Sequence, residues 1–80
     1  MSLEGTFASQ IYNARTERNL TQKEVAEAVQ ISVRWYQELE KGTRLPGAVV
    51  MLRLILFFGL NVEVFREEVG IVEKPSVYSD

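Results

Sequence analysis

The chain has 80 residues, 46% of them hydrophobic and 25% charged, which suits one small folded domain and leaves no room for a second. It contains no cysteine and no histidine. Disulfides and thiolate zinc sites are therefore excluded, and the commonest acid–base catalyst and metal ligand at neutral pH is missing. We expect no enzyme activity, no metal and no cofactor.

The net charge is −2, and the acidic excess lies in residues 45–80, which carry three basic and five acidic side chains. Residues 1–44 carry six of each, so a local basic face remains open there. The most apolar run, residues 45–62, is interrupted by a proline, two glycines and an arginine. A membrane helix needs about 20 apolar residues, and no basic segment followed by an apolar stretch opens the chain. We expect a cytoplasmic protein that does not contact membranes.

Apolar residues recur at helical spacing in short segments, and no segment alternates as a strand would. The expected helices are residues 6–18, 21–29, 32–41, 48–58 and 62–68. The Gly5-Thr6 pair marks the start of the first. Thr21 with Glu24 forms a capping box for the second, Ser32 caps the third, Gly42 ends it, and Asn61 caps the fifth. The sequence therefore predicts an all-α fold.

The fourth segment is apolar at ten of its eleven positions. A domain of this size cannot surround such a helix completely, so part of this region should meet another surface. We expect a homodimer interface formed by Phe57, Phe58, Val62, Val64, Phe65 and Val69. The alternative is that these side chains only close a small core with the first helix. Residues 1–69 are expected to form the domain, and residues 70–80 a tail docked on it or at the dimer interface.

Two short helices joined by a turn at Gln30-Ile31 are typical of a helix-turn-helix. The outer face of the second of them carries Val33, Arg34, Gln37, Glu38 and Lys41. Arginine can bond guanine, and glutamine adenine, through two hydrogen bonds in the major groove. A polar face of this kind is also found on any solvated surface helix, so the composition of the face leaves both interpretations open.

The residues from Ile11 to Val64 resemble the Xre-type helix-turn-helix family of phage repressors and Cro. The resemblance rests on Arg15, Leu20-Thr21-Gln22, Val25-Ala26, Ile31-Ser32, Leu39-Glu40-Lys41-Gly42, Pro46 and the run from Leu56 to Leu60. It implies a compact five-helix, lambda-repressor-like domain that binds duplex DNA, with residues 33–41 in the major groove. It also implies a homodimer on a two-fold operator. Repression is the expected output, because so short a chain has no sensing domain.

With this resemblance, the candidate base contacts are Val33, Arg34, Gln37 and Glu38. The candidate phosphate contacts are Gln22, Lys23, Lys41, Thr43 and Arg44, and Arg18 is a weaker one. Gln22 corresponds to a glutamine that holds a phosphate in the family. Contacts of this kind make binding strongly dependent on salt.

Arg15 and Glu40 are charges on the inner stripes of their helices. Because a buried unpaired charge is very costly, they are expected to form an ion pair, as the family has at the matching positions. Trp35 is expected to pack against the chain around residues 42–46, with a contact to the DNA backbone as the alternative. Gln30 replaces the usual turn glycine, so a positive φ at this position would strain the backbone.

A different function uses the same fold. In that hypothesis the domain is a protein-interaction module, antitoxin-like or binding a regulator, and its partner covers the fourth helix and the tail. The acidity and the apolar excess favour it. Replacing Arg34 and Gln37 by alanine separates the two hypotheses, because only DNA binding should fail.

Overall fold

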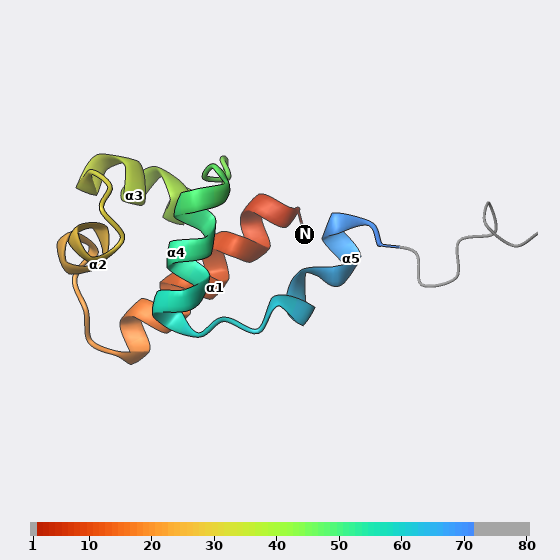
Figure 1. The fold of residues 1–80 in the computed structure, drawn as a ribbon, viewed down its shortest axis with the longest axis horizontal. Helices are drawn as coiled ribbons and strands as arrows, with labels where there is room; N and C mark the ends of the chain where they lie inside the picture. Colours follow the sequence, from red (N-terminus) through yellow and green to blue (C-terminus); the bar gives the residue numbers. More distant parts are fainter. Residues whose placement is uncertain (1, 72–80) are drawn as a thin grey trace, which may run out of the picture.

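The computed structural model describes residues 2–71, and every regular element within that range is helical. The elements are α1 (Leu3–Glu17), α2 (Gln22–Ala28), α3 (Val33–Lys41), α4 (Ala48–Phe58), the 3-10 helix η1 (Val62–Phe65) and α5 (Arg66–Val69). Figure 1 shows α2 and α3 gathered at one end of the molecule, α4 lying across α1, and α5 at the opposite end. The predicted all-α fold is confirmed. The tail beyond Ile71 lies outside the described residues.

The helix α1 begins one turn earlier than the Gly5-Thr6 pair predicts. The Ser2 hydroxyl accepts a hydrogen bond from the Gly5 backbone amide at 3.0 Å and caps the helix. Gly5 is therefore a helical residue, and the expectation of a turn there is wrong. A Cβ atom on Gly42 would lie 3.4 Å from the Ala8 Cβ and 3.5 Å from the Gly5 Cα, so small residues allow the end of α3 to approach α1.

The two helices of the predicted helix-turn-helix have the expected caps. The Thr21 hydroxyl accepts from the Glu24 amide at 3.0 Å, and the Glu24 carboxylate accepts from the Thr21 amide at 2.8 Å. Ser32 caps α3 by accepting from the Trp35 amide at 3.0 Å. Gly42 ends α3 with a φ of +82°, a conformation that glycine adopts without steric cost.

The turn between α2 and α3 keeps a left-handed residue without glycine. Gln30 has a φ of +63°, so the strain anticipated from the sequence is present. The Gln30 amide donates to the Glu27 carbonyl at 3.2 Å, and the Ile31 amide donates to the Ala26 carbonyl at 2.9 Å. These bonds close the end of α2 and hold the turn in the shape that sets the angle of α3.

One hydrophobic core joins all four long helices. α1 packs against α3, α4 and η1, and α2 packs against α3. The core residues are Phe7, Ile11, Ala14, Val25, Ala26, Val29, Tyr36, Leu39, Leu54, Phe58 and Phe65. The buried face of α2 is thus formed by Val25 and Ala26, and that of α3 by Tyr36 and Leu39.

The C-terminal part is less regular than the sequence predicts. Asn61 caps the segment by accepting from the Glu63 amide at 3.0 Å, as expected, but the first turn is the 3-10 helix η1 and only the last four residues are α-helical. The tighter turn places Phe65 against Phe7, with ring centroids 5.9 Å apart. The segment thereby closes the core beside the start of α1.

Two of the six predicted dimer residues are not on the surface. Phe58 and Phe65 are 3% and 7% exposed and belong to the core of the chain itself, so for them the simpler alternative is correct. Phe57, Val62, Val64 and Val69 are exposed. No helix in residues 2–71 has the length and apolar character needed to span a membrane.

Candidate nucleic-acid interface

The outer face of α3 presents polar side chains to solvent. Arg34, Gln37 and Lys41 are exposed and Glu38 is half-buried. Val33 is also half-buried and packs against the core. Four of the five side chains predicted for this face are therefore polar and in contact with solvent. Val33 is only partly exposed.

Glu38 and Lys41 neutralise each other on this face. The Lys41 Nζ lies 2.9 Å from a Glu38 carboxylate oxygen. The hydrogen bond and charge of Lys41, with the nearby charges of Arg44 and Arg34, lower the pKa of Glu38. Glu38 is thus an ionised acceptor at neutral pH, and Lys41 compensates its negative charge on this face.

Trp35 and Arg44 form a second feature of this surface. The Arg44 guanidinium carbon lies 5.5 Å from the centroid of the Trp35 ring, within the range of a cation–π contact. Together with Ser32, Arg34 and Glu38 they line a hollow beside α3. Trp35 is also partly buried against the core, a contact that the sequence did not predict. Its contact with Arg44 does lie within residues 42–46, where packing was expected, and it supports an arginine that the sequence marked for phosphate.

Beneath the exposed face lies a buried ion pair. The Arg15 Nε is 2.7 Å from one Glu40 oxygen and the Arg15 Nη2 is 3.0 Å from the other, with side-chain exposures of 14% and 7%. The Arg15 Nη1 donates to the Leu20 carbonyl at 3.0 Å. The pair expected from the sequence is present, and it ties the end of α3 to α1 and to the start of α2.

The environment of this pair keeps Glu40 ionised. Burial acts to raise the pKa of Glu40, but the hydrogen bonds from Arg15 and Gln22 and the nearby Tyr36 hydroxyl outweigh it, and the net shift is downward. Burial and the Glu40 carboxylate raise the pKa of Tyr36. The Tyr36 hydroxyl is buried with no hydrogen bond of standard geometry to the described residues, although this carboxylate is near it.

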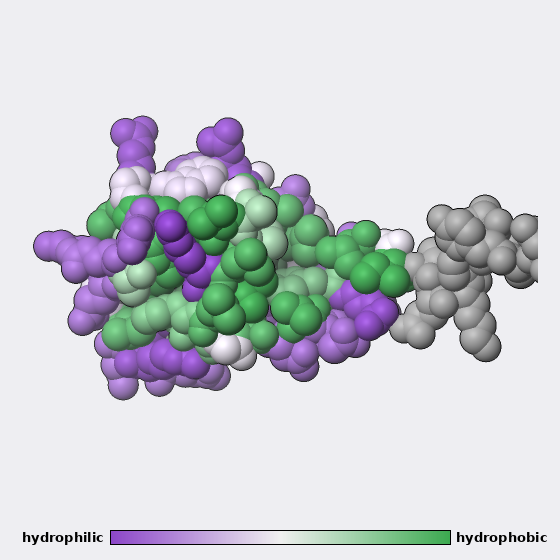
Figure 2. All heavy atoms as spheres, viewed as in Figure 1, coloured by the Kyte–Doolittle hydropathy of each residue, from purple (hydrophilic) through white to green (hydrophobic). Residues whose placement is uncertain are grey.

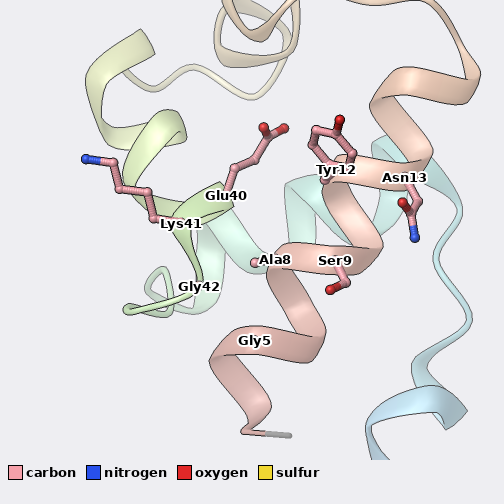
Figure 3. A pocket seen from close by; sticks show the side chains of 8 residues that line it. All are labelled: Gly5, Ala8, Ser9, Tyr12, Asn13, Glu40, Lys41 and Gly42. Carbon is pink, nitrogen blue, oxygen red and sulfur yellow. The ribbon is translucent and has the colours of Figure 1, made fainter.

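Gln22 connects the ion pair to the exposed face. Its Nε2 donates to the Glu40 Oε1 at 3.0 Å, and its Oε1 accepts from the Gln37 Nε2 at 3.1 Å. Both residues line a depression with Tyr12, Glu40 and Lys41. Figure 3 shows the adjoining hollow, in which the Glu40 side chain extends from α3 toward Tyr12 of α1 while Lys41 points away.

Sequence comparison identifies this architecture. The model of the helix-turn-helix domain matches residues 8–65, which include the core, the ion pair and the exposed face of α3. The chain belongs to the helix-turn-helix domain family. This confirms the predicted Xre-type family, whose proteins are DNA-binding regulators, and favours that function over the protein-interaction module.

Two relatives of this helix-turn-helix chain bear printed names that describe regulators. It is 36% identical over 70 residues to the cryptic phage CTXphi transcriptional repressor RstR of Vibrio cholerae, covering 85% of this chain and 63% of the relative. It is 38% identical over 55 residues to the uncharacterized HTH-type transcriptional regulator YqaF of Bacillus subtilis, covering 69% and 72%. The chain thus spans less than two thirds of the Vibrio repressor. No solved structure matches.

The remaining predicted phosphate contacts of the helix-turn-helix domain differ in their surroundings. Lys23, Thr43 and Arg44 are exposed. Arg18 is exposed, and its guanidinium donates to the Ala14 carbonyl at 3.0 Å and to the Phe58 carbonyl at 2.8 Å. Arg18 therefore joins the ends of α1 and α4, and a contact of its remaining N–H groups with phosphate stays a prediction.

The sequence interpretation of this domain missed the links between its polar residues. The bonds from Gln22 to Glu40 and Gln37, and the stacking of Arg44 on Trp35, join residues on different elements. Each residue was marked separately, and no spacing in the sequence announces their contact. The one signal available was the pair of charges on inner stripes, which located the Arg15–Glu40 ion pair.

Proposed function

We propose that the chain binds duplex DNA sequence-specifically and acts as a transcriptional repressor in the cytoplasm, with α3 in the major groove. The observation that carries the proposal is the exposed polar face of α3, which is anchored to α1 and α2 through the buried ion pair. The proposed base contacts are Val33, Arg34, Gln37 and Glu38. The proposed phosphate contacts are Gln22, Lys23, Lys41, Thr43 and Arg44.

Arg34 is the residue from which we expect the strongest base contact. It is exposed at the start of α3, and no side chain among the described residues pairs with it at ion-pair distance. Its guanidinium is therefore available for the O6 and N7 atoms of guanine, a contact worth about 1–3 kcal/mol of discrimination. Lys23 and Arg44 on either side of the helix-turn-helix supply positive charge for the flanking phosphates.

The proposed repressor acts as a homodimer. Apolar side chains of α4, η1 and α5 remain exposed, and Figure 2 shows them as a continuous apolar area over this part of the molecule. Within it is a mainly apolar groove lined by Met51, Ile55, Val62, Phe65, Val69 and Ile71 together with the charged residues Glu63 and Arg66. Exposed apolar patches on small soluble domains usually mark interaction sites, and a two-fold dimer covers the same face on both copies. In this dimer, the domain (residues 1–69) and the start of the tail of one copy would contact the same surface of the second copy.

The test is selection of bound duplexes from a random pool at about 50–100 mM salt, where phosphate contacts still hold. Enrichment of a palindrome is the expected result, and Arg34→Ala should lose the preference at one base pair of each half-site. Arg53→Ala is the control for loss of the same charge from α4. Its fold is checked by thermal melting, because the Arg53 Nη1 also donates to the Val29 carbonyl at 3.3 Å. A folded protein that enriches no duplex contradicts the proposal and favours the protein-interaction module, whose partner would then occupy the apolar face.

A further inference from the structure

The hydrogen bonds around Glu40 have a direction imposed by their chemistry. A carboxylate only accepts and a guanidinium only donates. Arg15 holds both Glu40 oxygens, at 2.7 and 3.0 Å, and fixes the carboxylate in place. Any further group bound to this carboxylate must offer it an N–H or O–H. The Glu40 carboxylate is therefore a hydrogen-bond acceptor in a fixed position, at one end of a chain of hydrogen bonds.

That acceptor determines the orientation of two glutamine amides. Gln22 must turn its NH2 group to Glu40, and does so at 3.0 Å. Its carbonyl oxygen is then left for Gln37, whose NH2 group bonds it at 3.1 Å. An amide has a donor side and an acceptor side, so turning either amide over would place two donors or two acceptors against each other. The order Glu40, Gln22, Gln37 is the one in which every contact is satisfied.

The last member of this chain of bonds lies on the exposed face of α3. Gln37 is exposed, and only one of the two hydrogens of its NH2 group is used by Gln22. The carbonyl oxygen and one N–H remain for a ligand, with their positions set. A glutamine reads adenine by donating to N7 and accepting from the N6 amino group, which needs this pair of groups in one order.

We propose that Gln22 and Glu40 are specificity-determining positioning residues, which orient the Gln37 amide so that it selects adenine in the operator. The inference rests on the proposed function and deepens it. An unheld amide can turn its carbonyl oxygen away from guanine, which has two acceptors at these positions, and donate to it through the NH2 group alone. The held amide keeps its carbonyl oxygen beside the N–H. It therefore makes two hydrogen bonds with adenine but meets guanine with its oxygen against an acceptor.

The substitution Gln22→Met tests this without disturbing the ion pair. Methionine has a similar length and makes neither hydrogen bond, while Arg15 and Glu40 stay in contact. Duplexes are selected with the natural protein, with Gln37→Ala to identify the base pair that Gln37 reads, and with Gln22→Met. Glu27→Met is the matched control, since Glu27 is an exposed position of α2 that is not among the proposed DNA contacts. Thermal melting verifies that each variant is folded.

The natural protein should prefer adenine at that base pair by about tenfold, as one good amide–base contact provides. Gln22→Met should reduce the preference for adenine to about twofold or less, because the Gln37 amide is then no longer held in one orientation. The preferences at the other base pairs should stay as they are. An unchanged adenine preference in Gln22→Met, or a base other than adenine at that position, overturns the inference.

A measurement without DNA separates this inference from the proposed function. In the free protein, the side-chain NH2 signals of Gln37 should differ from those of the exposed Gln30 and should exchange more slowly with solvent. The Gln37 signals should move toward the Gln30 values in Gln22→Met and remain unchanged in Glu27→Met. If the Gln37 and Gln30 signals are alike in the natural protein, the amide is not held and the inference fails. If Gln37 is held but no duplex is enriched, the proposed function fails and the assignment of adenine with it.

Discussion

The first three helices and the C-terminal part of the domain differ in the side chains that they present at the surface. In α1 to α3 the polar side chains bond one another across elements, from Arg15 to Glu40, Gln22 and Gln37. In α4 to α5 large apolar side chains remain in solvent, and Leu56 is 79% exposed. Both parts pack on the same core. The difference indicates a polar surface already ordered within one chain and an apolar surface that is incomplete in one chain.

This contrast separates two kinds of experiment. Changes to the polar network should alter the stability and base preference of a single chain, whereas changes to the exposed apolar face should alter assembly. A change to the polar network that altered only assembly, or a change to the apolar face that altered base preference, would contradict this distinction. The following predictions run from the largest expected effect to the smallest.

Glu40→Ala should destabilise the fold by about 3–5 kcal/mol, because it leaves the Arg15 guanidinium buried without its partner. Thermal melting of the variant and of the natural protein measures the loss. Glu27→Ala is the control, since Glu27 is exposed on α2 and its removal should change the stability by no more than about 0.5 kcal/mol. Equal melting temperatures for Glu40→Ala and the natural protein would contradict the structural role of the pair.

Val69→Asp should weaken the dimer by at least about tenfold, because burying one exposed valine contributes about 1.5–3 kcal/mol and a charge at the seam adds a penalty. Sedimentation equilibrium at micromolar concentration measures the shift to monomer. Val49→Asp is the matched control, because Val49 on α4 is also exposed, at 61% against 49% for Val69, but does not line the groove. A natural protein that is monomeric at these concentrations would contradict the dimer.

The polar network should also make stability dependent on pH. The folded-state pKa of Glu40 lies below the ordinary value of 4.5, so its contribution is complete above that value and disappears as the pH falls through the folded-state pKa. Unfolding free energies measured between neutral and strongly acidic pH should fall more for the natural protein than for Glu40→Gln. If the unfolding free energies of the natural protein and of Glu40→Gln fell equally with pH, Glu40 would not be the source of the pH dependence.

Gln30→Gly should stabilise the domain by up to about 1 kcal/mol, which for a chain of this size raises the melting temperature by roughly 4–8 °C. The reason is the φ of +63° at Gln30, which costs glycine little. Asn19→Gly is the control, because Asn19 has a φ of +56° and asparagine tolerates this conformation better. A larger gain at Asn19 than at Gln30 would contradict the strain at the turn.

Tyr36→Phe should have the smallest effect, within about 1 kcal/mol and of either sign. The hydroxyl is buried without a hydrogen bond of standard geometry, so its removal eliminates a desolvated group and leaves the ring in place. Thermal melting decides this. A loss of several kcal/mol would mean that the hydroxyl bonds Glu40 in solution and belongs to the network.

Local rules explain how much of the fold could be read from the sequence. The caps at Thr21 and Ser32 and the stop at Gly42 each depend on residues within one turn of the chain, and the structure has all three. The start of α1 was placed wrongly because Gly5 in a helix resembles a turn signal. Gly5 lies where Gly42 approaches α1, a contact between distant residues that a local rule cannot include.

The candidate site divides in the same way. The sequence by itself determined which faces of α2 and α3 are apolar, that Arg15 and Glu40 must be paired, and that the chain resembles helix-turn-helix regulators, because periodicity and the cost of burying charge act through composition and spacing. Only the tertiary structure decided that Arg18 serves α4, that Phe58 and Phe65 belong to the core, and that Gln22 links Glu40 to Gln37. Those outcomes depend on which elements pack together, since a hydrogen bond between helices forms only where packing brings donor and acceptor within about 3 Å.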